Sequence, residues 1–185
     1  MKSKFQKRIF TVCKVGVCTA IIAISSYISI PMTIPVTMQN LAVMLISGLF
    51  GLKIGLFSTL AYILLGIAGL PIFSGAQAGL SAIFGMSGGF ILGFIIVSIF
   101  VGAASDLMYK RGKSSFKIRF FIMLSANVLL YACGVLFYCF IYANGDGVTV
   151  VSAIALLVLP YVVPDLIKTI LAAYLSKRLS FLKNT

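Results

Sequence analysis

Two charged residues, Asp165 and Lys168, stand three positions apart in an otherwise uncharged apolar stretch near the end of this 185-residue sequence. This spacing places both side chains on one face of a helix. Each charge costs about 2.5 to 3.5 kcal/mol at the centre of a membrane-spanning helix, so a chain that carries two must gain something from them. We interpret the pair as the acceptor and the donor of a recognition site for a small polar molecule. A purely structural ion pair is the alternative.

Two prolines in the same stretch, Pro160 and Pro164, support the interpretation as a site. Each proline removes a backbone N–H donor and disturbs the carbonyl group four residues earlier. Inside a membrane, freed backbone groups are tolerated only where they are buried in protein or line a cavity. The prolines therefore predict a cavity beside the charged pair.

Two irregular segments are candidates for completing this cavity. The segment 31–40 combines two prolines with hydroxyl and amide side chains, and we interpret it as a lid because it is too stiff and apolar for a simple connector. The segment 71–89 is rich in glycine, so its backbone N–H groups can approach a ligand closely. A packed connecting turn is the alternative for either segment. The candidate ligand-contacting residues in them include Thr37, Gln39, Gln77 and Gly79.

Three other features resemble chemical sites but lack essential partners. Residues 85–88 read Gly-Met-Ser-Gly, the pattern of a serine nucleophile, yet the chain contains no His to serve as general base. Residues 112–114 resemble the end of a P-loop, but Leu107 stands where the first glycine is required. The four cysteines are too widely spaced for a metal site. We therefore expect no enzyme activity, no metal and no cofactor.

The elements that must position the charged pair follow from the composition. Hydrophobic residues make up 61% of the chain and charged residues 10%, against roughly 45 to 50% and 25% in soluble domains. The mean hydropathy is +1.15. A net charge of +12 would suit nucleic acid, but the basic residues flank the apolar stretches instead. The sequence therefore predicts a multispan protein of the lipid bilayer that binds no nucleic acid.

Charge-free stretches, divided by the roughly 20 residues that one spanning helix needs, predict six transmembrane helices. Pro31 and Pro35 separate the first two helices, and the glycine-rich segment separates the third from the fourth. The predicted fold class is all-α and polytopic, with residues 1–185 forming a single six-helix membrane domain. We expect the helices at 8–30, 40–52, 54–70, 90–106, 120–142 and 148–176.

The basic residues predict the orientation, because Lys and Arg accumulate in cytoplasmic loops and tails. With six spans both termini lie on one side, and that side would hold every Lys and Arg except Lys168. We therefore expect cytoplasmic N- and C-termini, and outer loops at 31–39, 71–89 and 143–147. A cleaved signal peptide is the alternative for the basic N-terminus, although five further spans favour an uncleaved first helix.

Four motifs, spread over nearly the whole chain, resemble those of the BioY family, the biotin-capturing subunits of energy-coupling-factor (ECF) importers. The sequence departs from the family at residues 85–89, where Gly-Met-Ser-Gly-Gly replaces the usual Gly-Pro-Thr-Gly-Gly. The motifs are Pro35-Val36-Thr37-Met38-Gln39, Gly66-Ile67-Ala68-Gly69-Leu70-Pro71-Ile72-Phe73, Gly88-Gly89-Phe90 with Gly93-Phe94, and Pro164-Asp165-x-x-Lys168.

The resemblance implies high-affinity capture of biotin from outside the cell membrane. It also implies two kinds of partner, a membrane coupling (T) subunit and two ABC-type ATPase subunits that bind ATP. The ureido ring of biotin would meet the charged pair, and its carboxylate would lie near Gln77, which stands close to the family's loop asparagine; the reverse orientation, with Lys168 on the carboxylate, stays open. The substrate-binding residues expected from the resemblance are Asp165, Lys168, Gln77, Gln39, Thr37, Phe73 and Gly79.

For docking on the coupling subunit, the family uses small residues four apart on its first helix. Gly16 and Ala20 have this spacing here, as do Thr19 and Ala23, so the expected partner-docking residues are Gly16, Ala20 and Ala23. Packing within the chain is the alternative for this face.

Three other functions remain open at this stage. The first is capture of another vitamin by a subunit of the same architecture. The second is a small channel or ion-coupled carrier without ATPase partners, in which Asp165 relays a proton. The third is a membrane assembly protein without a ligand, which predicts no saturable binding.

Overall fold

Apolar stretches of the sequence form helices that satisfy their own backbone hydrogen bonds, as lipid surroundings require. The computed structural model describes residues 4–32, 34–112, 115–142 and 149–184. The α-helices in these ranges are α1 (Lys4–Tyr27), α2 (Gln39–Phe50), α3 (Leu52–Ile67), α4 (Leu80–Phe84), α5 (Gly88–Lys110), α6 (Phe116–Phe137), α7 (Val150–Leu157) and α8 (Val162–Arg178). The smaller elements are strands β1 (Ser29–Ile30) and β2 (Val36–Thr37), 3-10 helices at Ser74–Ala76, Leu159–Tyr161 and Ser180–Asn184, and a π-helical turn at Tyr138–Tyr142. The predicted helical fold class is confirmed.

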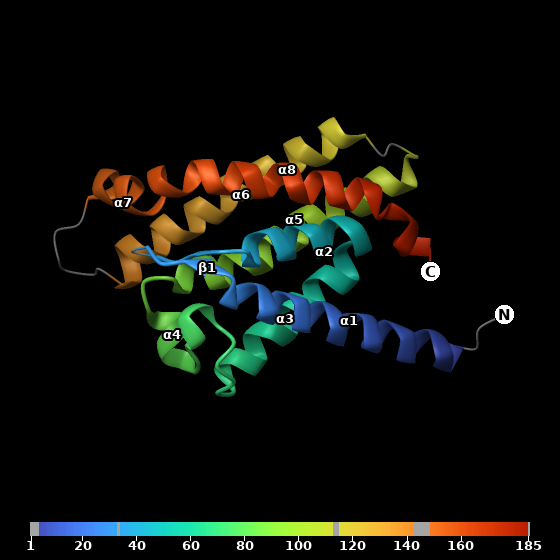
Figure 1. Cartoon of the computed structure of the whole chain (residues 1–185), viewed down its shortest axis with the longest axis horizontal. Coiled ribbons are helices and arrows are strands. Elements are labelled where there is room, and N and C mark those ends of the chain that lie inside the picture. Colours follow the sequence, from blue (N-terminus) through green and yellow to red (C-terminus); the bar gives the residue numbers. More distant parts are fainter. Residues whose placement is uncertain (1–3, 33, 113–114, 143–148, 185) are drawn as a thin grey trace.

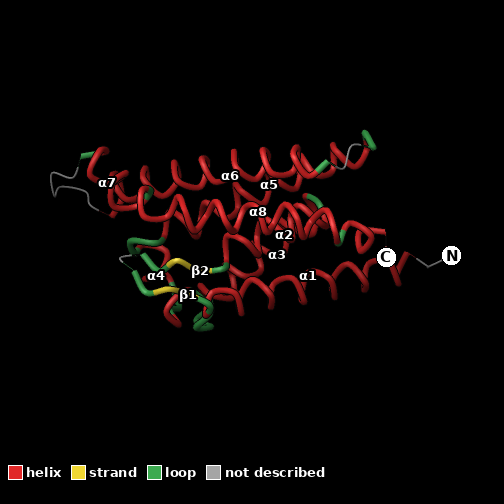
Figure 2. Tube along the Cα trace, turned by 45° about the horizontal axis from the view of Figure 1, so that its top comes forward, coloured by secondary structure: helices red, strands yellow, loops and turns green. Residues whose placement is uncertain are grey.

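Helix α2 lies at the centre of the structure. The long helices run along the longest axis of the molecule, with α5, α6 and α8 grouped together and α1 and α3 on the other side of α2 (Figures 1 and 2). Helix α2 packs against α8, α5 and α3, and nine of its 12 residues are buried. It is apolar around most of its circumference because it has protein on nearly every side. The fully buried side chains of this core include Ile22, Val43, Met44, Tyr62, Val97, Met123 and Ala172.

Helices α2 and α3 are joined by a single residue, Gly51. Its φ of +84° lies in the region that favours glycine. A Cβ atom there would also collide with the carboxylate of Asp106 from α5. That carboxylate accepts a hydrogen bond from the backbone N–H of Leu52 at 3.0 Å, which satisfies a free donor at the start of α3. A residue of α5, which comes much later in the sequence, therefore stabilises this abrupt turn.

Arg119 lies beside the same junction. It is one of the bases expected on the side of the termini, and its side chain is buried inside the helix bundle, which was not predicted. Its Nη1 donates to the backbone carbonyl of Gly48 at 2.8 Å, and the hydroxyl of Ser105 donates to the same carbonyl at 2.6 Å. A positive charge near the C-terminus of α2 also suits the helix dipole. Arg119 therefore holds helices together instead of extending into solvent.

The stretch expected as one helix over 148–176 is divided into α7, a 3-10 turn and α8. The division falls around Pro160, which lies in the turn. Proline cannot donate the backbone hydrogen bond that a continuous helix requires and clashes with the preceding turn. The other expected helices correspond to α1, α2, α3, α5 and α6, with shifted ends.

Two of the expected outer loops carry secondary structure of their own. The first, at 31–39, contains β2, which pairs antiparallel with β1, with Ser29 opposite Thr37 and Ile30 opposite Val36. Strand β1 lies at the end of the stretch expected as the first helix, because α1 ends at Tyr27. The second contains α4 and the 3-10 helix at Ser74–Ala76. The third, at 143–147, lies outside the described residues. Figure 1 shows both described segments at the end of the molecule opposite the two termini.

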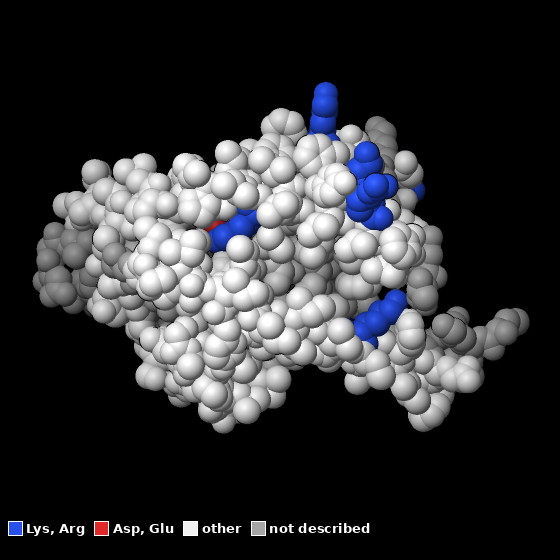
Figure 3. Space-filling view, viewed as in Figure 1, with Lys and Arg blue, Asp and Glu red and all other residues white. Residues whose placement is uncertain are grey.

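The helices and charges have the distribution of a membrane protein. Within the described ranges, four helical segments are long and apolar enough to cross a membrane, namely Arg8–Tyr27, Gly88–Lys110, Phe116–Tyr142 and Val150–Arg178. Helices α2 and α3 are shorter apolar helices. Figure 3 shows Lys and Arg atoms gathered toward the end of the molecule that carries the termini, apart from one blue and red patch in a hollow nearer the middle.

Candidate functional site

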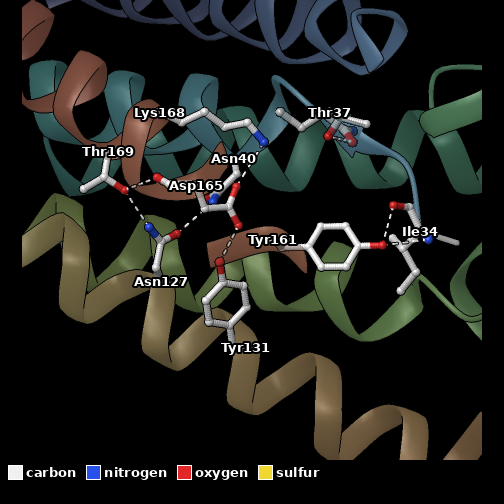
Figure 4. Close-up of polar contacts among 10 residues, drawn as sticks. Ile34, Thr37, Asn40, Asn127, Tyr131, Tyr161, Asp165, Lys168 and Thr169 are labelled. Atoms are coloured by element: carbon white, nitrogen blue, oxygen red, sulfur yellow. Dashed lines mark hydrogen bonds and ion pairs between the residues drawn. The ribbon is translucent and has the colours of Figure 1, made fainter. Parts of the chain in front are cut away.

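Asp165 and Lys168 form an ion pair on α8, as their spacing predicts. Lys168 Nζ lies 3.0 Å from Asp165 Oδ1. The two residues are 7% and 5% exposed, so solvent screens their charges weakly. The hydroxyl of Tyr131 on α6 donates to the other carboxylate oxygen at 2.7 Å (Figure 4). The carboxylate is thus held from two sides, and it keeps lone pairs for further donors.

The ion pair lines a pocket that also has an apolar wall. The free volume of the pocket is about 70 Å³, below the roughly 300 to 1,000 Å³ of typical small-molecule sites, so a ligand of that size requires the lining segments to move apart. A few polar groups beside apolar and aromatic side chains are typical of small-molecule sites. The lining residues are Ile34, Pro35, Val36, Thr37, Gln39, Asn40, Ser74, Ser87, Phe90, Ile91, Phe94, Leu130, Tyr131, Tyr161, Asp165 and Lys168.

The segment interpreted as a lid covers one side of this pocket and is tied to the other side by Tyr161. The Tyr161 hydroxyl donates to the backbone carbonyl of Ile34 at 2.7 Å and accepts from the backbone N–H of Ile34 at 2.9 Å (Figure 4). Both partners are buried. One phenol therefore fastens the lid to the turn between α7 and α8.

Thr37 and Gln39 also line the pocket, but their polar groups bond within the protein. Thr37 Oγ1 donates to Gln39 Oε1 at 3.0 Å, and Gln39 Nε2 donates to the hydroxyl of Tyr62. Tyr62 in turn donates to the backbone carbonyl of Ile72 at 3.1 Å. These bonds connect the lid to the glycine-rich segment.

The remaining expected ligand contacts do not line this pocket. Phe73 is 1% exposed and packs edge-on against Tyr62, with ring centroids 5.5 Å apart. Gly79 precedes α4, and its backbone N–H donates to the carbonyl of Gly66 at 2.8 Å. Gln77 lines a neighbouring outer hollow that shares Ser74 and other residues with the pocket. Phe73 and Gly79 therefore shape the glycine-rich segment, and Gln77 lies beyond the pocket's edge.

The expected docking residues lie along α1. Gly16 and Ala20 are exposed, and a Cβ atom built on Gly16 would meet nothing within 4 Å. Ala23 is half-buried and packs against the core. Gly16 and Ala20 therefore leave part of α1 uncovered by the rest of the chain.

The structure adds site residues that the sequence reasoning missed. Tyr131 contacts the ion pair, and Tyr161 contacts the lid. Asn40 lines the pocket next to Gln39. Asn127 lies one helical turn before Tyr131 on α6, and Asn127 Nδ2 donates to the hydroxyl of Thr169 at 2.6 Å. Polar residues four apart in an apolar helix were the available signal, because this spacing marks one face.

Among the residues that the structure describes, no three His, Cys, Asp or Glu side chains lie close enough to hold an ion.

Comparisons with known proteins, by sequence and by structure, all match proteins of one kind. The family model described as the BioY family matches residues 1–184. A biotin transporter BioY from Thermotoga maritima is 32% identical over 171 residues, covering 92% of this chain and 95% of that protein. Biotin transporter BioY2 from Lactococcus lactis is 31% identical over 166 residues, covering 89% and 86%. The crystal structure of an S-component for biotin from an ECF-type ABC transporter superposes with a TM-score of 0.82 at 23% identity, covering 97% of this chain and 94% of that one, and shows the same fold.

Proposed function

The chain belongs to the BioY family, and on that premise we propose that it captures biotin and imports it across the cell membrane as the substrate-binding subunit of an ECF-type, ATP-driven transporter. It is a transport protein and not an enzyme. The observation that carries the proposal is the buried pair Asp165–Lys168 at the polar end of a pocket with an apolar wall. Two relatives that match most of the chain are named biotin transporters, which supports biotin as the ligand.

The chemistry of biotin matches the two parts of the pocket. Its ureido ring offers a carbonyl acceptor to Lys168, which spends one of its three N–H donors on Asp165. A ureido N–H group is a donor for a free lone pair of Asp165. The thiophane ring and valeryl chain suit the apolar wall formed by Phe90, Phe94 and Leu130.

The carboxylate of biotin lies, in this proposal, toward the outer segments. Ser74 and Ser87 line both the pocket and the neighbouring hollow, and Gln77 lies in that hollow. Their hydroxyl and amide groups can donate to a carboxylate. Phe73 and Gly79 contribute by shaping this segment, and Thr37 and Gln39 contribute by joining it to the lid.

We propose a six-span topology with cytoplasmic termini. Helices α7 and α8, with the turn between them, count as one span, and α2 and α3 complete the set as shorter spans. The basic residues toward the end with the termini (Figure 3) support a cytoplasmic location for that end. The pocket, next to the lid at the other end, then opens outward.

Energy for accumulation must come from partners, since the sequence contains no usable P-loop. We propose a membrane coupling subunit and two ABC-type ATPases, with the uncovered face at Gly16 and Ala20 as the docking surface and Ala23 at its inner edge. Small residues allow close approach of helices in a membrane.

Equilibrium binding of labelled biotin to the purified protein tests the proposal, with riboflavin and thiamine as competitors. We expect saturable binding that unlabelled biotin displaces and the other vitamins do not. Displacement by riboflavin or thiamine would indicate a different vitamin, and no saturable binding would reject capture altogether. Uptake that follows a proton gradient without ATPase partners would instead indicate an ion-coupled carrier.

A further inference from the structure

A chain of three buried hydrogen bonds runs from α8 through α6 to the pocket-lining end of α2. Thr169 Oγ1 donates to the backbone carbonyl of Asp165 at 2.6 Å, and Asn127 Nδ2 donates to Thr169 Oγ1 at 2.6 Å. Asn40 Nδ2 then donates to Asn127 Oδ1 at 2.7 Å. Figure 4 shows Asn40 and Asn127 beside the Asp165–Lys168 pair.

The direction of this chain is fixed at its α8 end. A hydroxyl group has a single proton, and two oxygen atoms 2.6 Å apart require a proton between them, so the proton of Thr169 points to the Asp165 carbonyl. The hydroxyl can then only accept from Asn127. Asn127 must therefore turn its NH₂ toward Thr169 and its carbonyl oxygen toward Asn40, and Asn40 must turn its NH₂ toward Asn127.

Because its NH₂ group points to Asn127, the side-chain amide of Asn40 directs its oxygen away from this series of hydrogen bonds. Asn40 is 5% exposed and lines the pocket together with Lys168. Its Oδ1 is buried and has no hydrogen-bond partner among the described residues. A buried acceptor without a partner costs free energy, and a hydrogen-bond donor on a ligand would remove this cost.

We infer that Asn40 is a specificity-determining residue whose Oδ1 accepts an N–H from the ureido ring, with Asn127 and Thr169 as the residues that orient it. The inference rests on the proposed capture of biotin. Asp165 already accepts from Lys168 and Tyr131, so Asn40 supplies a second, neutral acceptor for a ligand with two N–H groups. The site then selects cyclic ureas over rings in which one N–H is missing.

Binding of biotin is compared with binding of two lactam analogues, each with one ureido N–H replaced by CH₂, in the wild-type protein and in Asn40→Leu. We expect Asn40→Leu to bind biotin roughly 10- to 100-fold more weakly, because a ligand donor is left unpaired. One of the two analogues should then bind the variant as well as biotin does. If both analogues lose the same factor in the variant as in the wild type, Asn40 acts structurally and the inference is wrong.

Thr169→Val tests whether Thr169 orients Asn40, and it replaces Asn40→Leu as the test if that variant does not fold. It removes the hydroxyl that directs the chain, so biotin affinity should fall, and the preference for biotin over the same analogue should shrink. Thr59→Val is the matched control, because Thr59 is also fully buried and donates to a carbonyl four residues earlier, at 3.0 Å, outside the pocket lining. The control should keep wild-type affinity and preference. Equal losses in both Thr variants, or an unchanged preference in Thr169→Val, would overturn the inference, whereas wild-type protein that binds no biotin would overturn the proposed function with it.

Discussion

Replacing Asp165 by Asn should weaken biotin binding, although the two side chains have nearly the same shape. The carboxylate accepts from Lys168 at 3.0 Å and from Tyr131 at 2.7 Å, and an amide can accept at one of its two terminal atoms only. In the proposed complex a ligand N–H group that donates to this carboxylate also loses a hydrogen bond to a charged group, worth about 1.5 to 3 kcal/mol. Affinity should therefore drop roughly 10- to 150-fold.

Isothermal titration of biotin into detergent-solubilised protein measures this drop, and a thermal unfolding curve of the same sample shows whether the variant is folded. Asp106→Asn provides a matched control, because Asp106 also accepts a partly buried hydrogen bond, from Leu52 N at 3.0 Å, but does not line the pocket. It should lower thermal stability and leave biotin affinity unchanged. A folded Asp165→Asn protein with wild-type affinity would refute the assignment of the ion pair to the ligand site.

Three further changes probe the pair, the docking face and the lid. The double change Asp165→Leu with Lys168→Leu should leave membrane insertion intact or improved, because two insertion costs disappear, while biotin binding is lost; normal binding would make the pair merely structural. Ala20→Trp should abolish ATP-driven uptake in cells but keep biotin affinity in detergent, since the face is uncovered by the rest of the chain; joint loss of both would assign this face to internal packing. Tyr161→Phe removes two hydrogen bonds to the lid, each worth about 0.5 to 1.5 kcal/mol, so stopped-flow release of biotin should be roughly 5- to 150-fold faster. An unchanged release rate would show that the lid does not limit exit.

Local spacing was enough to predict the central pair of the site but not its surroundings. Asp165 and Lys168 lie on one helix, so helical geometry alone brings them together. Tyr131 on α6 bonds to Asp165, and Asn40 on α2 lines the same pocket. Only the packing of the three helices brings these residues together. Phe73 belongs to a recognisable motif, yet its side chain packs into the core because the glycine at position 66 leaves room for the ring.

The same contrast applies to the fold. Apolar stretches and basic flanks predict a helical membrane protein, because both follow from the length of a span and the chemistry of lipid. The break in the last span was not predicted, although Pro160 was recognised, since a proline can kink a helix or end it. The burial of Arg119 was not predicted, because its partners Gly48 and Ser176 come from other helices.

The junction between α2 and α3 has a consequence for the order of events during synthesis. Its partners arrive late, since Asp106 follows Leu52 by 54 positions and Arg119 follows Gly48 by 71. When α2 and α3 leave the ribosome, the backbone groups at their junction therefore still lack these partners. Because unsatisfied backbone groups are costly in lipid, we expect this hairpin to reach its final arrangement only after α5 and α6 have entered the membrane.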